Sequence, residues 1–180
     1  MEEFELFERL PGGALSWRGL VPDLGSALVS VCLLADDTGH ECRATDPGTG
    51  EVMLSRTPLP GGRRILQIAY SRILATRAHL LCRDGYDVTS VTGNQVAEFV
   101  LRTHPAYDLF VVGDAATEGV RLSMVRWLHE HYPATRIVAL NRHGQVLDDL
   151  RYNAPDEPPS AWLPLVSQAM AQSRRDAQIG

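Results

Sequence analysis

The stretch Arg64-Ile65-Leu66-Gln67-Ile68-Ala69-Tyr70 begins the pattern that decides the fold. Its apolar residues predict a strand, and the apolar spacing from Ile73 to Arg83 predicts the helix that follows it. Asp84-Gly85 marks the end of that helix, because glycine readily adopts the backbone conformation found just beyond a helix C-terminus. Strand and helix patterns then alternate, which is typical of right-handed β-α-β units in a doubly wound parallel sheet.

Further elements complete this pattern downstream. Strands are predicted at residues 86–91, 107–112 and 136–141, and helices at residues 94–102, 118–131 and 161–174. Asn94 and Ser160 are the expected N-caps of the first and last of these helices. In the helix over 118–131, the predicted apolar face consists of Val120, Met124, Trp127 and Leu128. Residues 142–150 must hold what remains of a further helix, and Asp148 to Tyr152 form either a fifth strand or a loop.

A smaller unit precedes the alternating pattern. A hairpin is predicted from residues 4–10 and 15–20, then a helix opened by Pro22-Asp23, then a strand pair at residues 41–45 and 51–54. Two prolines and two glycines between Thr57 and Arg64 indicate a linker. Residues 1–62 hold ten acids and four arginines, whereas residues 63–180 hold twelve acids and thirteen arginines. We therefore expect a small α+β module (1–57), a linker (58–64), an α/β domain (65–174) and a tail (175–180).

Composition excludes several classes of protein and of chemistry. The 180 residues are 44% hydrophobic, enough for a real core, and the longest apolar stretch is too short to span a bilayer. All 17 basic residues are arginine, so a catalytic lysine or a P-loop lysine is impossible. We expect no membrane contact and no nucleic-acid partner, because the charge provides no basic face. The acidic start, Met1 to Glu5, favours a cytoplasmic protein.

Motifs for metal binding or nucleophilic catalysis are missing from the sequence. Cys32, Cys42 and Cys82 lie far apart without a CxxC pair, and the six histidines have no partners at ligand spacing. No GxSxG motif and no GxGxxG motif occurs. The sequence therefore predicts neither a metal site nor an enzyme.

Three segments of this part resemble the receiver domain of bacterial response regulators. They are residues 65–70, the corner Asp84-Gly85-Tyr86-Asp87-Val88 and residues 107–112. The resemblance spans roughly residues 63–171 and depends mainly on the spacing of the elements. It implies a flavodoxin-like fold and a role in two-component phosphorelay signalling. It also implies a pocket in which an aspartate after the third strand accepts a phosphoryl group. In that pocket, acidic residues after the first strand hold Mg²⁺, and a hydroxyl and a lysine bind the phosphoryl oxygens.

The residues at the corresponding positions lack this chemistry. Ala69 and Tyr70, followed by Ser71, stand where the acidic pair belongs, and Gly113 stands at the acceptor position. Asn141 replaces the hydroxyl residue, and the lysine region around Ala154 holds no lysine. The expected pocket is therefore a degenerate receiver pocket that needs no cofactor. It comprises Ala69, Tyr70, Ser71, Gly113, Asp114, Asn141 and Ala154.

Three functions remain open at this point. The first, which the residues favour, is a pseudo-receiver that acts by binding a signalling protein or a second copy of itself, without phosphoryl transfer. The second is a regulator phosphorylated, with Mg²⁺, at the irregularly placed Asp114. The third is a small-ligand binder or enzyme that uses the crevice at the carboxyl ends of the strands, lined by Tyr70, Ser71, Asp114 and Asn141.

Overall fold

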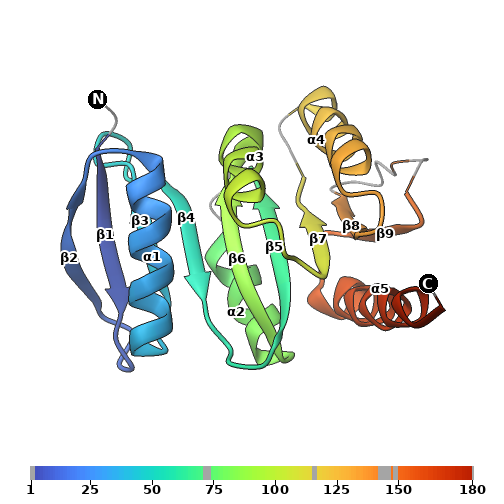
Figure 1. Ribbon diagram of the computed structural model, residues 1–180, viewed down its shortest axis with the longest axis horizontal. Helices are drawn as coiled ribbons and strands as arrows, with labels where there is room; N and C mark the ends of the chain where they lie inside the picture. The colour runs from blue at the N-terminus through green and yellow to red at the C-terminus, as the bar shows by residue number, and fades with distance from the viewer. Residues whose placement is uncertain (1–2, 71–73, 115–116, 142–146, 148–149, 180) are drawn as a thin grey trace.

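The computed structural model describes residues 3–70, 74–114, 117–141, 147 and 150–179 (Figure 1). The strands are β1 (Phe4–Arg9), β2 (Leu15–Val21), β3 (Cys42–Thr45), β4 (Val52–Thr57), β5 (Arg63–Ala69), β6 (Tyr86–Thr92), β7 (Leu109–Val112), β8 (Arg136–Asn141) and β9 (Tyr152–Pro155). The helices are α1 (Leu24–Thr38), α2 (Leu74–Arg83), α3 (Gly93–Thr103), α4 (Glu118–His131) and α5 (Pro159–Ile179). Among these described helices, none is long and apolar enough to cross a membrane.

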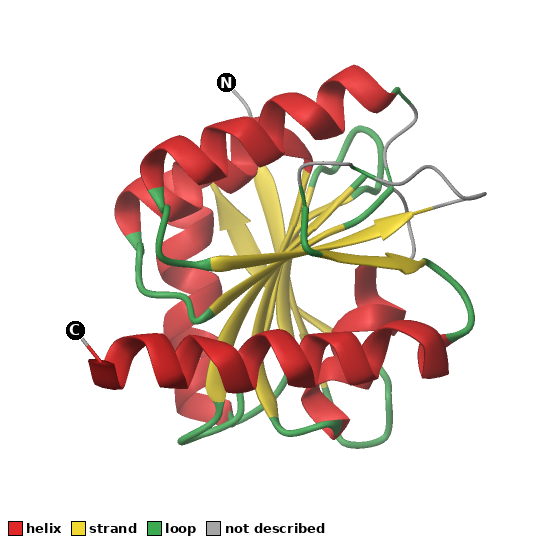
Figure 2. Cartoon of the chain, turned by 90° about the vertical axis from the view of Figure 1, so that its right-hand side faces the viewer, coloured by secondary structure: helices red, strands yellow, loops and turns green. Residues whose placement is uncertain are grey.

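The nine strands form one sheet in the order β2-β1-β3-β4-β6-β5-β7-β8-β9. From β6 to β9 every pairing is parallel, with β5 between β6 and β7. Helices lie on both sides of the sheet when it is seen edge-on (Figure 2). Side chains of α1, α3 and α4 join one hydrophobic core, and those of α2 and α5 join another. This arrangement confirms the predicted flavodoxin-like, doubly wound sheet.

The central strands supply both cores, which explains their nearly continuous apolar sequence. Leu66 and Ile68 of β5 belong to the core beneath α3 and α4. Ile65 of the same strand belongs to the core beneath α2 and α5. All four residues of β7 are buried. Successive side chains of a strand point to opposite faces, so a strand covered on both faces must be apolar throughout.

The N-terminal part continues the same sheet rather than forming a separate one. Strands β2, β1, β3 and β4 are antiparallel, and β4 pairs with β6 from Leu54 opposite Val91 to Thr57 opposite Val88. Strand β5 begins at Arg63, inside the segment expected to be a linker. The division of the chain into two modules stays a prediction, but this hydrogen-bonded junction joins its two halves.

Helix boundaries differ from the expectations in three places. Thr92, not Asn94, is the N-cap of α3, and Asn94 lies in the first turn of that helix. Ser160 lies inside α5, because this helix begins at Pro159, whose fixed φ suits a first turn. Helix α5 also continues past Arg174 to Ile179, since neither glycine nor proline occurs between Arg174 and Gly180.

Two other expectations need correction. In α4 the buried residues are Arg121, Met124, Val125 and Leu128, whereas Val120 is 42% exposed and Trp127 is only partly buried. The last strand is Tyr152–Pro155, so it begins where the alternative strand was expected to end. The expected remnant of a further helix at residues 142–150 falls mostly outside the described residues.

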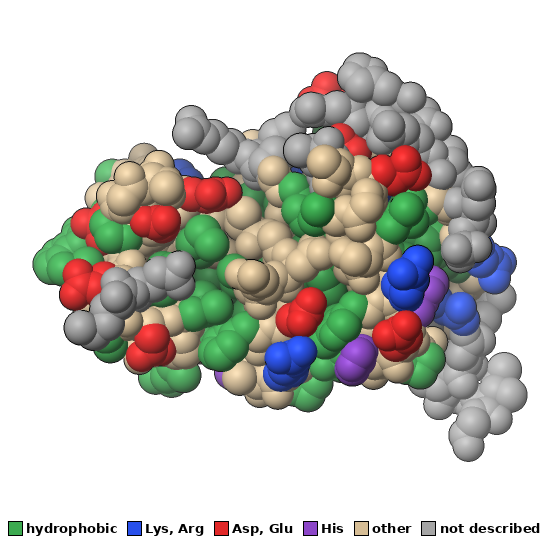
Figure 3. All heavy atoms as spheres, turned by 90° about the horizontal axis from the view of Figure 1, so that it is seen from above, with side chains coloured by type: hydrophobic (Ala, Val, Ile, Leu, Met, Phe, Trp, Pro, Cys, Tyr) green, Lys and Arg blue, Asp and Glu red, His purple; other side chains and the backbone are tan. Residues whose placement is uncertain are grey.

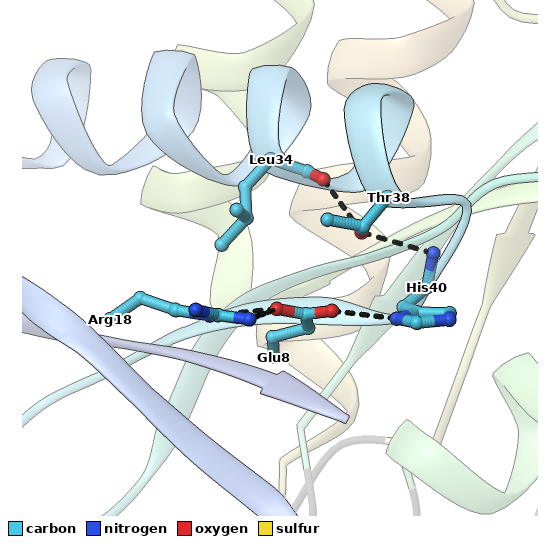
Figure 4. A network of polar contacts seen from close by, with 5 residues as sticks. All are labelled: Glu8, Arg18, Leu34, Thr38 and His40. Atoms are coloured by element: carbon cyan, nitrogen blue, oxygen red, sulfur yellow. Dashed lines mark hydrogen bonds and ion pairs between the residues drawn. The ribbon is translucent and has the colours of Figure 1, made fainter. Parts of the chain in front are cut away.

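A buried carboxylate ties the N-terminal hairpin to the end of α1 (Figure 4). Glu8 is 2% exposed, and Arg18 Nε donates to its Oε2 at 2.7 Å. His40 Nδ1 lies 2.6 Å from Oε1 of the same carboxylate. The His40 backbone N–H donates to Thr38 Oγ1 at 3.2 Å, which fixes the loop that carries the imidazole. The hydrogen bond from His40, followed by that from Arg18, lowers the pKa of Glu8 from its ordinary 4.5.

We predict that Glu8→Gln is less stable than the native chain near neutral pH, because a neutral amide cannot replace the charged partner of Arg18 and His40. The pKa of Glu8 is lowered by folding, so this stabilisation is present above the ordinary pKa and is lost as the pH falls through the lowered value. Urea unfolding followed by circular dichroism at several pH values measures the difference. Glu98→Gln, which removes an exposed i,i+4 pair with Arg102, is the control. Equal stability of Glu8→Gln and the native chain at neutral pH would contradict the prediction.

Candidate functional site

The carboxyl ends of β5, β7, β8 and β9 meet at one edge of the sheet, the usual ligand position in open α/β folds. Ala69 ends β5, Gly113 follows β7, and Asn141 ends β8. The Gly113 backbone N–H donates to the Ile68 carbonyl oxygen at 2.8 Å, which brings the ends of β5 and β7 together. The structure thus gathers the predicted pocket residues at this edge, except Ser71, which lies outside the described residues, and Ala154, which lies within β9.

The place of a side chain at position 113 is taken by an arginine. Arg77 of α2 is 4% exposed, and its Nη1 would lie 2.8 Å from a Cβ built on Gly113. The Ile68 carbonyl oxygen would lie 3.2 Å from the same Cβ. Arg77 Nη2 forms an ion pair with Asp156, the first residue after β9. A guanidinium therefore fills the space that an acceptor side chain would need.

A second arginine reaches this edge from the opposite helix layer. Arg121 of α4 is 1% exposed, and its Nη1 donates to Asn141 Oδ1 at 2.7 Å and to the Leu140 carbonyl oxygen at 3.1 Å. The same Nη1 lies 3.6 Å from Asp114 Oδ1. Asp114, the irregular acceptor candidate, thus faces a buried cation.

Asn141 joins β8 to the segment around β9. Its side-chain Nδ2 donates to Asn153 Oδ1 at 3.1 Å, while its side-chain Oδ1 accepts from Arg121. Its backbone carbonyl oxygen accepts from the Asp156 N–H at 2.9 Å. Asn153 Nδ2 in turn donates to the carbonyl oxygens of Leu147 at 3.0 Å and Leu150 at 2.6 Å. Both ends of the Asn141 amide are therefore engaged within the protein.

Tyr70, at the second position expected for an acid, links β5 to two helices. Its hydroxyl donates to Asn94 Oδ1 at 2.6 Å. Asn94 Nδ2 then donates to the Val120 carbonyl oxygen at 3.0 Å and to Ser123 Oγ at 3.1 Å. Burial raises the pKa of Tyr70, so the phenol stays protonated at neutral pH. The Asn94 side chain is thus engaged with Tyr70 and α4 instead of capping its own helix.

The charges at this edge are the reverse of those that the receiver resemblance implies. Asp156, an acid, is the first residue beyond β9, whereas the resemblance implies a lysine after the fifth strand of the parallel sheet. Ala154, expected in the lysine region, is a buried residue within β9. Conversely, the cation of Arg77 lies at Gly113, where the resemblance implies an acidic acceptor.

The described residues do not fit Mg²⁺. This cation prefers carboxylate and other oxygen ligands, whereas Ala69 and Tyr70 offer no carboxylate and two guanidinium groups lie nearby. Across the described part of the chain, no group of three or more histidine, cysteine or acidic side chains could hold a metal ion.

The sequence did not predict a role at this edge for Arg77, Arg121, Asn153 or Asp156. One signal for Arg121 was available, because residues 121, 124, 125 and 128 follow the i, i+3, i+4, i+7 spacing of a buried helix face. An arginine inside such a stripe indicates a buried cation that needs a partner. The pairing of Arg77 with Asp156 had no such signal, since 79 positions separate the two residues.

We predict that Asp156→Asn lowers the free energy of unfolding by about 3 kcal/mol, because it leaves the buried Arg77 cation without its counter-charge. Urea unfolding at neutral pH measures the change. Asp36→Asn is the matched control: the Asp36 side chain is 57% exposed in its ion pair with Arg56, so less than about 1 kcal/mol is expected. Similar losses in the two variants would contradict the assignment of a buried, stabilising pair.

Comparison with known proteins identifies the fold. No protein-family model and no curated protein sequence matches the chain. Among solved structures, the signal receiver domain of an HD domain-containing protein from Pseudomonas fluorescens Pf-5 matches with TM-score 0.57 and 14% identity, over 65% of this chain and 93% of that one. A response regulator receiver protein from Sinorhizobium medicae WSM419 matches with TM-score 0.54 and 22% identity, over 64% of this chain and 99% of that one.

A third solved structure is a putative pilus assembly-related protein from Burkholderia pseudomallei K96243. It matches with TM-score 0.51 and 24% identity, over 63% of this chain and 93% of that one. The matched share corresponds in length to the segment from β5 to α5. At these identities the likeness concerns the fold, and this chain therefore contains a receiver-like, flavodoxin-like domain.

Proposed function

We propose that the protein is a non-catalytic signalling module, a pseudo-receiver that acts through protein–protein contact without phosphoryl transfer. The observation that carries this proposal is the position of the Arg77 guanidinium against Gly113. Phosphoryl transfer to a receiver needs an oxygen nucleophile after the third strand of the parallel sheet. Glycine offers none, and the space for a side chain is filled.

The state of Asp114 supports the same proposal. Its carboxylate is the acidic group nearest the acceptor position in sequence, but it lies 3.6 Å from the Arg121 guanidinium. A carboxylate that pairs with a buried cation is a weaker nucleophile than a free one. The described residues also offer no acidic partners that could hold Mg²⁺ beside an incoming phosphoryl group, and the nearby cations of Arg77 and Arg121 are already paired with Asp156 and Asp114.

The polar groups expected to serve a ligand crevice also support a structural role. Tyr70 is engaged with Asn94, and Asn141 with Arg121 and Asn153. These contacts cross-link strands and helices. A small-ligand binder or enzyme would have to break several of them before its substrate could use the same groups.

The thiol chemistry of the chain fits a non-catalytic protein as well. Burial raises the pKa of Cys42 to about 11 and also raises the pKa of Cys32 and Cys82. A thiol needs a lowered pKa to be a good nucleophile at neutral pH. The three cysteines therefore act as small apolar side chains.

We predict that incubation with acetyl phosphate and Mg²⁺ leaves the intact mass unchanged, because the acceptor oxygen is missing at position 113. Mass spectrometry measures the result, with a phosphorylatable receiver domain labelled in parallel. A mass increase of one phosphoryl group that is lost in Asp114→Asn would overturn the proposal and make the chain a working regulator. An increase that persists in Asp114→Asn would also overturn it and place the acceptor elsewhere.

We further predict that millimolar Mg²⁺ does not raise the thermal unfolding temperature. A ligand that binds only the folded state stabilises it. Among the described pocket residues the one carboxylate is that of Asp114, and it already faces the buried Arg121 cation at 3.6 Å. Differential scanning fluorimetry with and without Mg²⁺ measures this, with Na⁺ at equal ionic strength as the control. A rise specific to Mg²⁺ that disappears in Asp114→Asn would contradict the prediction.

A further inference from the structure

In the described part of the chain, helix packing on the outer strands β1, β2 and β3 comes mainly from α1, which covers one of their faces. Helix α1 lies across β1 and β3 and packs on β1 to β4 (Figure 1). Of these four strands, α2 packs mainly on β4. Phe4, Leu6 and Glu8 of β1 are buried on the α1 side. Glu5, Phe7 and Arg9 alternate with them and therefore point to the opposite face.

The opposite face carries a cluster of apolar and charged side chains. The register of β1 and β2 places Glu5 opposite Leu20, Phe7 opposite Trp17, and Arg9 opposite Leu15. Cross-strand partners lie on the same face. Leu15, Trp17 and Leu20 are 42%, 57% and 55% exposed. Hydrophobic side chains gather among acidic ones at this end of the molecule (Figure 3). We call this set the open-face patch: Glu5, Phe7, Arg9, Leu15, Trp17 and Leu20.

Strand addition at the edge of β2 is disfavoured by the strand itself. The register shifts between Leu6 and Phe7 of β1, which forms a bulge at Arg18. Arg18 then turns inward to the buried Glu8. Bulges and inward-pointing charges are devices that protect an edge strand from pairing. A partner would therefore pack on the face of the patch rather than extend the sheet.

The patch is complementary to itself. Along β1 an acid, an aromatic residue and an arginine follow at every second position, and along β2 a tryptophan lies between two leucines. A two-fold axis across the strands reverses this order. It brings Glu5 of one copy to Arg9 of the other, Leu15 to Leu20, and Trp17 to Trp17. Isologous interfaces require such a surface, in which one patch meets its own copy.

We propose that the open-face patch is the interface of a homodimer formed by face-to-face packing of these sheets. Arg43, whose guanidinium lies 5.7 Å from the Phe7 ring centroid, borders the patch on the side of β3. Arg9 also contacts Glu41 at 2.9 Å, which orients its side chain without removing its charge. This inference does not depend on the pseudo-receiver proposal, because it concerns a different surface and a different measurement.

Sedimentation velocity over a concentration series tests the dimer at physiological salt, where charge repulsion beyond about 8 Å is screened. We expect a monomer–dimer equilibrium for the native chain, and a dissociation constant at least roughly tenfold higher for Trp17→Ser. Leu33→Ser is the matched control, since Leu33 is 61% exposed on α1 and lies outside the patch. A monomer at every concentration would overturn the proposal, as would a dimer that Trp17→Ser leaves unchanged.

A charge exchange tests the two-fold arrangement directly. Glu5→Arg and Arg9→Glu should each weaken self-association, because like charges would then meet across the axis. An equimolar mixture of the two variants should regain the native affinity as a heterodimer, since each altered charge meets its complement. Circular dichroism checks that both variants fold. If Arg9→Glu does not fold, the self-association of Glu5→Arg alone tests the two-fold arrangement. Dimers of Glu5→Arg as tight as the native ones, or a mixture of folded variants that stays monomeric, would overturn the arrangement.

Discussion

The buried ion pair between Arg77 and Asp156 is the contact on which the carboxyl edge of the sheet depends. It joins α2 to the segment after β9, across the ends of the central strands. It also places a guanidinium against Gly113, so the residue after β7 cannot carry a side chain without moving that group. Arg121 reaches the same edge from the other helix layer. At this edge, where open α/β folds usually bind ligands, the two arginines instead join helices α2 and α4 to the ends of the strands.

This arrangement separates the fold of the receiver-like domain from its chemistry. The parallel sheet needs only apolar strands and two helix layers, and both are present. Phosphoryl transfer needs a particular charge pattern at one edge, and that pattern is inverted here. The N-terminal strands extend the same sheet, so a partner bound on them would contact a surface continuous with the receiver-like part. In the proposed function, surfaces rather than the pocket carry the role of the protein.

The periodicity of apolar residues predicted the fold, because each strand and helix must bury its apolar side chains. The limits of α4 and β8 agree with the predicted ones, and the hairpin of β1 and β2 was recognised from its turn residues. Apart from shifted ends of α5 and β9, the errors concern side chains in the helices α3 and α4. Asn94 resembled an N-cap, but its amide bonds Tyr70 and α4; Val120 resembled a core residue, but Arg121 takes that position. The missing acceptor and acidic pair were visible in the sequence, and the spacing of the buried face of α4 offered a signal for Arg121. The Arg77 guanidinium at Gly113 had no such signal, because its pairing with Asp156 is tertiary and leaves no local pattern.

The burial of Arg77 and Arg121 among protein partners at the carboxyl edge can be measured in solution. Hydrogen exchange of arginine side chains, measured by ¹⁵N NMR, tests it most directly, with resonances assigned by their loss in Arg77→Met and Arg121→Met. Arg102, whose side chain is 67% exposed, provides the reference for a solvated guanidinium. We expect the side-chain protons of Arg77 and Arg121 to exchange much more slowly than those of Arg102, because exchange requires opening of the protein. Exchange of both arginines as fast as that of Arg102 would instead show an open, solvated pocket without buried ion pairs.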